Sequence, residues 1–158
     1  QLLDIPREDV QAFTLELVEQ HVAERDATNF LLRASQHPGH RVQAFVAGWL
    51  DHYTSGKPEL IEQLLPFFRT LLEQICRGRL AKDRVFDFLE RESQEDEATA
   101  RMVLPLLERL VLTIAVGDRA RCLVLLNGLR RKYPHLDTPL RTIPSPAPTT
   151  LSPSFHGI

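Results

Sequence analysis

The stretch LLPFFRTLLEQI, residues 64–75, decides the predicted fold because the chain repeats it. VLPLLERLVLTI at residues 103–114 keeps the same pattern of apolar residues. One constant shift, which sets Pro66 on Pro105, aligns the two stretches without a gap, and we call it the repeat shift. Repetition at a fixed period of this length is typical of chains built from stacked helical units.

The alignment continues beyond these two stretches. The repeat shift sets Gly78 on Gly117 and Val85 on Val124, and the same shift taken backwards sets Ala27 at the position of the two prolines. A pair of short helices cannot bury its apolar face alone, so neighbouring pairs must stack around a common core. We therefore expect two clear units and a weaker one before them.

Apolar residues recur at spacings of three and four from residue 6 to residue 133, which predicts helices throughout this region. We expect a cap helix of about 18 residues that begins near Pro6, where a first-turn proline loses no hydrogen bond. Gly56 is predicted to end one helix and Pro58 to open the next. The predicted helical pairs lie at about 26–55, 58–92 and 97–133.

Two further helix starts are predicted from capping signals. SQED at 93–96 matches a capping box, in which the hydroxyl of Ser93 and a later carboxylate bond to unpaired N–H groups. It follows a helix predicted at about 80–91, so the acidic run at 90–97 is expected to be a solvated loop and helix start. Asp118 is predicted as the N-cap of the last helix.

This pattern resembles the HEAT and armadillo class of helical repeats. The resemblance rests on the helix, turn, helix period, on the proline in LLPFF and VLPLL and on the glycine turns, over residues 26–133. We expect each proline to kink its helix. The predicted fold class is all-α, with about seven antiparallel helices stacked as a short α-solenoid or packed as an irregular helical bundle.

Composition limits the classes of protein that remain. The chain has 158 residues, 43% of them hydrophobic, and a formal net charge of -2, so a strongly basic nucleic-acid binder is disfavoured. Cys76 and Cys122 lie in apolar helical patterns, which indicates neither a disulfide framework nor a zinc site. The sequence has no run of about 18 apolar residues and no signal-peptide pattern at its N-terminus, so we predict no membrane partner. We expect part of a larger intracellular regulatory protein, cytoplasmic or nuclear.

No arrangement of residues predicts an enzyme. The patterns GxxxxGK[ST], GxGxxG and GxSxG are absent. Cys122 has apolar neighbours that should raise its pKa, so we expect a core residue. HPGH at 37–40 suits a turn better than a metal site, and Asp51 and His52 are adjacent and would point apart on a helix. We predict no catalytic, metal-binding or cofactor-binding residue.

Basic and aromatic side chains are the candidates for contact with a partner. Cations gather near the glycine turns, and they could line one edge of the stack and meet an acidic protein or RNA. The alternative is a solvated face, since the helix dipole favours cations near helix C-termini. The candidate partner-binding residues are Arg77, Arg79, Lys82, Arg84, Arg119, Arg121, Trp49 and Tyr53.

The segment 134–158 differs in composition from the helical region. It holds six of the eleven prolines and many hydroxyl residues, which predicts an extended tail. Thr138, Ser145 and Ser152 each precede a proline and are candidate phosphorylation sites. If the tail is ordered, its apolar residues could dock on the helices; these are Leu140, Ile143, Leu151 and Phe155.

Together these features predict a non-enzymatic protein–protein interaction module, a scaffold or adaptor whose partner is another protein or a peptide. The alternative is an RNA-associated helical module that uses the basic turns between helices. The two differ in salt dependence, because contacts with phosphate weaken steeply as salt is added.

Overall fold

The computed structural model describes residues 7–21, 24–74, 78–113 and 116–137. Within these ranges it contains seven α-helices and no strand, which confirms the predicted all-α class. The helices are α1 Glu8–His21, α2 Glu24–Ala34, α3 His40–Tyr53, α4 Pro58–Glu73, α5 Arg79–Glu95, α6 Glu97–Thr113 and α7 Val116–Lys132.

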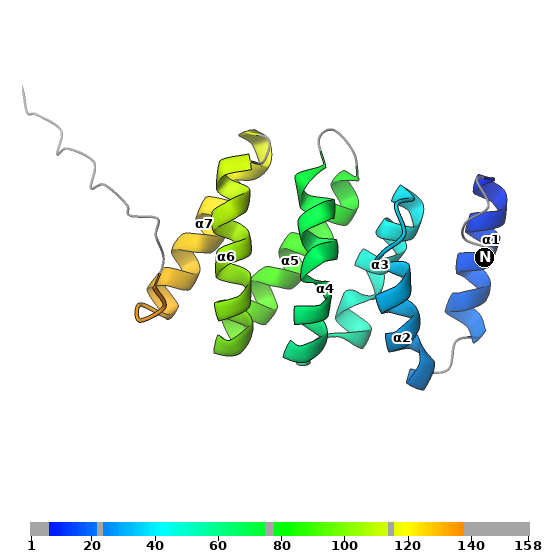
Figure 1. The fold of residues 1–158 in the computed structure, drawn as a ribbon, viewed down its shortest axis with the longest axis horizontal. Helices are drawn as coiled ribbons and strands as arrows, with labels where there is room; N and C mark the ends of the chain where they lie inside the picture. The colour runs from blue at the N-terminus through cyan, green and yellow to red at the C-terminus, as the bar shows by residue number, and fades with distance from the viewer. Residues whose placement is uncertain (1–6, 22–23, 75–77, 114–115, 138–158) are drawn as a thin grey trace, which may run out of the picture.

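The helices pack as a bundle of two rows. Figure 1 shows α2, α4 and α6 in one row and α3, α5 and α7 behind them, with α1 at the N-terminal end. Along the rows α4 packs against α6, α3 against α5 and α5 against α7, while α1 packs against α3. One hydrophobic core runs between the rows from α2 to α7.

The two repeated stretches occupy equivalent places in α4 and α6. Leu64 and Val103 are both fully buried. Pro66 and Pro105 are both exposed, and the helices continue through them. Because each proline lies on the solvent side, water can satisfy the carbonyl that loses its helical hydrogen bond. The kink expected at each proline stays a prediction.

Helices α3 and α5 also keep the repeat shift. Residues that the shift aligns are buried in both helices and present the same face to the core. Thr54 and Ser93, one such pair, each donate a side-chain hydroxyl to the carbonyl four residues earlier. The pairs are Val42 and Ala81, Gln43 and Lys82, Val46 and Val85, Ala47 and Phe86, Trp49 and Phe88, Leu50 and Leu89, and Thr54, directly after α3, and Ser93.

Helix α7 departs from this register by one residue. Val124, which the sequence aligns with Val85, is 67% exposed, whereas Val85 is fully buried. The predicted register would bury Asn127 at the position of Phe88, and a buried amide is costly without hydrogen bonds. Each buried residue at the end of the described chain lies one position beyond the place of a buried residue of α5, and only Leu125, which the repeat shift sets on Phe86, is also buried in the predicted register. These residues are Cys122, Leu125, Leu126 and Leu129 of α7, and Tyr133 directly after it.

The alignment of Ala27 with the prolines is wrong. Ala27 is fully buried, whereas Pro66 and Pro105 are exposed. In the short helix α2 it belongs to a buried stripe with Leu31 and Ala34, at spacings of four and three residues. Burial of this stripe decides the orientation of α2, so the position that faces solvent in α4 and α6 faces the core here.

The predicted capping box is also wrong. Helix α5 runs to Glu95, and Ser93 lies buried inside it with its hydroxyl bonded to Leu89. A buried hydroxyl that bonds back to its own helix does not end it. Asp96 caps α6 instead: its Oδ2 accepts hydrogen bonds of 2.8 Å from the N–H and from the hydroxyl of Thr99.

Three other helix boundaries can be compared with the prediction. The first-turn proline is confirmed, since Pro58 opens α4. Gly56 is left-handed with φ of 69°, but it lies two residues beyond Thr54, which is the C-cap of α3. Asp118 lies within the first turn of α7 rather than before it, because α7 begins at Val116. The cap helix α1 has 14 residues rather than about 18 in the described part of the chain.

The acidic run at 90–97 is not a solvated loop. Glu92 is 2% exposed and holds the turn between α3 and α4. Its Oε1 accepts a 2.6 Å hydrogen bond from the Ser55 hydroxyl and its Oε2 a 2.8 Å bond from the Gly56 N–H. These partners are distant in sequence, so local charge density alone predicted the wrong environment for Glu92.

Candidate functional site

Ion pairs join the helices of the α3, α5 and α7 row. Arg91 Nη2 of α5 lies 2.6 Å from Asp51 Oδ1 of α3. Arg121 of α7 reaches back to α5, where its Nη1 lies 2.9 Å from Asp83 Oδ1 and its Nη2 bonds to Asp87. These groups are partly or largely exposed, so each pair contributes modestly to stability. They do decide which charges remain available on this surface.

Lys82 links three helices. Its ammonium donates to the carbonyl of Gln74, just after α4, and lies 3.0 Å from Asp118 Oδ2 in α7. The Lys82 side chain is only 6% exposed. A buried ammonium requires partners of this kind, because removal from water strongly disfavours an unpaired charge. Lys82 was predicted to bind a partner, and its ammonium is used inside the fold.

Arg79, Lys82 and Arg121 come together at a depression of about 740 Å³ between the first turns of α5 and α7. Three of the predicted basic residues are therefore neighbours, and their role in partner binding stays a prediction. Asp83 and Asp118 line the same depression. Arg121 also lies over the Phe86 ring, with its guanidinium carbon 5.1 Å from the ring centroid. The acidic side chains offset much of the positive charge at this edge.

Trp49 and Tyr53 belong to an aromatic cluster on α2 and α3. The Trp49 ring lies 4.5 Å from the Phe45 ring and 4.8 Å from the Tyr53 ring, between centroids. Phe30 of α2 packs on the same group at 6.1 Å from Trp49. Trp49 is 8% exposed, whereas Phe45 and Tyr53 are half-buried. The cluster is mainly structural, with its edges reaching the surface.

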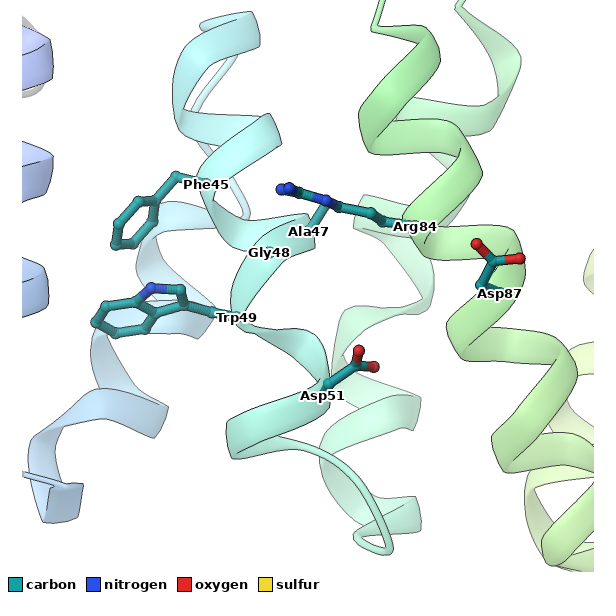
Figure 2. Close-up of a pocket in the computed structure, with 7 residues that line it drawn as sticks. All are labelled: Phe45, Ala47, Gly48, Trp49, Asp51, Arg84 and Asp87. Carbon is teal, nitrogen blue, oxygen red and sulfur yellow. The ribbon is translucent and has the colours of Figure 1, made fainter.

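An open groove lies beside this cluster, between α3 and α5. It has a volume of about 370 Å³ and is lined by Phe45, Ala47, Gly48, Trp49, Asp51, Arg84 and Asp87. Figure 2 shows Arg84 reaching from α5 toward Ala47 and Gly48, while Phe45 and Trp49 leave α3 on the other side. Two predicted partner-binding residues, Trp49 and Arg84, therefore both line this groove, with their side chains on opposite sides of the α3 backbone.

Gly48 lets Arg84 lie across the backbone of α3. A Cβ atom at this glycine would stand 3.0 Å from Arg84 Nη1. The guanidinium has no hydrogen bond or ion pair within the described residues, although two carboxylates line the groove. Asp51 is bonded to Arg91 and Asp87 to Arg121. Arg84 therefore offers unused donors at the surface.

Gly48 and Asp51 were not identified as site residues from the sequence. Asp51 was considered only beside His52, whereas its partner Arg91 lies on another helix. Gly48 carries no side chain to attract notice, and its role depends on a neighbouring helix. A repeat alignment offers one signal, because the repeat shift sets Phe45 on Arg84 and both line the same groove.

The remaining predicted residues are not part of this groove. Arg119 is exposed near the start of α7. Arg77 lies outside the described residues, as do the candidate phosphorylation sites Thr138, Ser145 and Ser152. For these four residues the roles proposed from the sequence stay predictions.

Cys122 is buried in α7, as its apolar neighbours predicted. Burial raises the pKa of its thiol to about 11, and the nearby Asp118 carboxylate acts in the same direction. A thiol with this pKa is almost wholly protonated at neutral pH, which makes it a poor nucleophile. Within the part of the chain that the structure describes, no helix is long and apolar enough to cross a membrane.

Comparison of the chain with protein family models, with curated proteins and with solved structures finds no match.

Proposed function

We propose that this chain is a non-enzymatic protein-binding module, a scaffold or adaptor, that holds an acidic segment of a partner protein in the groove between α3 and α5. The single observation that carries the proposal is the Arg84 guanidinium. It lies across Gly48 at the surface and is bonded to no other side chain among the described residues.

The chemistry of this group selects the partner. A guanidinium presents its N–H donors in a planar fork that matches the two oxygens of a carboxylate. The two aspartates of the groove are occupied by other arginines, Asp51 by Arg91 and Asp87 by Arg121. The half-buried Phe45 at the rim can contact an apolar residue next to the partner's carboxylate.

Protein binding is better supported than RNA binding. The basic turns would have to supply cations for phosphate, yet Lys82 is buried and bonded to Asp118. Arg121 is paired with Asp83 and Asp87. A phosphate backbone would also have to approach these aspartates, which repel it. The surface therefore supports binding of an acidic peptide better than it supports binding of RNA.

The wider setting is part of the same proposal. The shared burial of α3 and α5, and of the repeated stretches in α4 and α6, supports a repeated helical unit, and we propose that this unit is of the HEAT and armadillo kind. Such repeats present long surfaces to other chains. We place the module in the cytoplasm or nucleus within a larger regulatory protein, with Thr138, Ser145 and Ser152 as phosphorylation sites.

A peptide selection tests the function directly. Displayed random peptides are selected on the wild-type chain, on Arg84→Glu and on Arg101→Glu. The last is the matched control, because Arg101 is an exposed arginine of α6, in the other row. We expect the wild type and Arg101→Glu to enrich peptides that carry Asp or Glu beside an apolar residue, and Arg84→Glu to lose this preference.

Two results would count against the proposal. Peptides selected by Arg84→Glu that match those of the wild type would remove Arg84 from recognition. Generic RNA that binds tightly at low salt, and weakens steeply as salt is added, would favour the RNA-associated role instead.

A further inference from the structure

Helix α1 has an exposed apolar strip on its outer side. Leu15 is buried against the bundle, whereas Phe13 is 61% exposed and Leu17 is 36% exposed. Phe13 and Leu17 are four residues apart, so they lie next to each other along the helix. Asp9 and Glu16 are exposed beside them, and the Asp9 carboxylate is paired with Arg7 just before the helix. We call Asp9, Phe13, Glu16 and Leu17 the α1 face.

Helix α7 carries a similar strip at the other end of the bundle. Leu123 is 48% exposed and Val124 is 67% exposed, because the shifted register of α7 turns them away from the core. Arg119 and Arg131 are exposed one turn before and two turns after them. We call these four residues the α7 face. Exposed apolar strips with a polar rim are typical of interaction surfaces.

The two helices carry opposite charge. The sequence of α1 contains four acidic residues and neither lysine nor arginine. The sequence of α7 contains one aspartate and five lysines and arginines. Their formal charges are therefore -4 and +4, although Arg7 just before α1 pairs with Asp9 and Arg121 of α7 pairs with Asp83 and Asp87 of α5. The signs remain opposite after these pairs are set aside. Complementary charge around apolar contacts favours association and sets its orientation.

One chain cannot bring its own two faces together. Figure 1 places α1 at one end of the bundle and α7 at the other, with the α2–α3 and α4–α5 pairs between them. We propose that the occupant is a second copy, so that the α7 face of one chain packs against the α1 face of the next. This contact is head-to-tail, and repetition of it builds an open chain or a closed ring of copies.

The size of the contact predicts its strength. Helices of 14 and 17 residues are about 21 and 26 Å long, so their contact is smaller than a standard interface of about 1,600 Å². We expect a dissociation constant of about 10 to 100 μM that weakens with added salt. This inference is independent of Arg84 and of the groove between α3 and α5.

Sedimentation velocity on the full 158-residue chain, from about 10 to 500 μM, tests the proposal. The wild type should associate as concentration rises. Phe13→Glu and Val124→Glu should each be monomeric, because each lacks one of the two faces. Mixed together, they should form a one-to-one dimer that grows no further, since each supplies the intact face that the other lacks.

Leu80→Glu is the matched control. Leu80 is 63% exposed in α5 and belongs to neither face, so this variant should associate like the wild type. Thermal melts of the variants should agree within about 3 °C, because all three sites are exposed.

Three results would overturn the proposal. The first is a wild-type chain that stays monomeric at every concentration. If Val124→Glu then also melts at a lower temperature than the wild type, the α7 face is assigned to the tail of the same chain. The second is association that only Val124→Glu abolishes, which would indicate a symmetric pairing of two α7 faces. The third is a mixture of the two variants that forms no dimer.

Discussion

The contact between α3 and α5 and the contact between α5 and α7 join helices of one row, yet they differ in register. In the first, residues that the repeat shift aligns share their burial, and Val46 and Val85 are both fully buried. In the second, the buried residues lie one position further along, and Val124 faces solvent. A repeated sequence pattern therefore fixes a helix's place in the row without fixing which of its faces is buried.

The reason lies in the distribution of apolar residues. Helix α5 has one apolar stripe, and its opposite side carries charged residues such as Asp83, Arg84 and Asp87. Helix α7 has apolar residues on several sides, so more than one rotation would bury leucine. Asn127 decides between these rotations. The register of α5 would bury its amide, which is costly in a core without hydrogen-bond partners, whereas the observed register leaves Asn127 exposed. The resulting rotation exposes Leu123 and Val124.

The largest expected effect compares Val85→Asp with Val124→Asp. Val85 is fully buried, and a carboxylate there should lower the free energy of unfolding by more than about 3 kcal/mol. Val124 is 67% exposed, so the same change should cost less than about 0.5 kcal/mol. Urea unfolding measures both. Equal losses would show that α7 is buried in the same register as α5.

A smaller effect is expected at Lys82, which ties α5 to α7. Lys82→Met leaves the Asp118 carboxylate and the Gln74 carbonyl without their donor. Since Asp118 is partly exposed, we expect the free energy of unfolding to fall by about 2 kcal/mol. Lys57→Met is the control, because Lys57 is exposed and should change stability by less than about 0.5 kcal/mol. A loss no greater than that of the control would mean that Lys82 does not join the helices.

The smallest effect concerns the cap of α6. The backbone N–H and then the hydroxyl of Thr99 lower the pKa of Asp96 by hydrogen bonding to its charged form. This stability is present above the unfolded pKa of about 3.9 and is lost as pH falls through the folded pKa. Asp96→Ala should cost about 1 kcal/mol at pH 7, and the difference from the wild type should shrink toward about pH 3.

Urea unfolding of Asp96→Ala and the wild type across this pH range measures the change. A difference that stays constant with pH would show that the Asp96 charge has no part in capping. A matched variant is Glu95→Ala, because Glu95 is an exposed neighbouring carboxylate at the end of α5 and caps nothing in the described chain.

The sequence was a good guide where apolar periodicity was one-sided. The repeated stretches of α4 and α6 were placed correctly, because only one rotation of each helix buries their leucines and phenylalanines. It failed at Glu92 and Lys82, whose partners Gly56 and Asp118 are distant in sequence. Local pattern carries no information about such partners, so both residues were predicted to face solvent.

The candidate groove was predictable only in part. Arg84 and Trp49 were selected for their chemistry, and both line it. The use of Gly48 as a floor, and the pairing of Asp51 with Arg91, depend on how α3 lies against α5. The Arg84 guanidinium is left without a partner among the described residues because of that packing. No local pattern in the sequence predicts this.

Thiol labelling of α7 tests the shifted register most directly. Val124→Cys and Leu125→Cys are compared in a chain that also carries Cys76→Ser and Cys122→Ala, at about 1 μM so that association between copies is negligible. Val124 is 67% exposed and Leu125 is 3% exposed. We predict that Val124→Cys reacts at nearly the rate of an unfolded thiol and Leu125→Cys about 100-fold more slowly. Labelling of Val124→Cys as slow as that of Leu125→Cys would contradict the shifted register and, with it, the exposed face of α7, because the unshifted register sets these residues on Val85 and Phe86 and buries both.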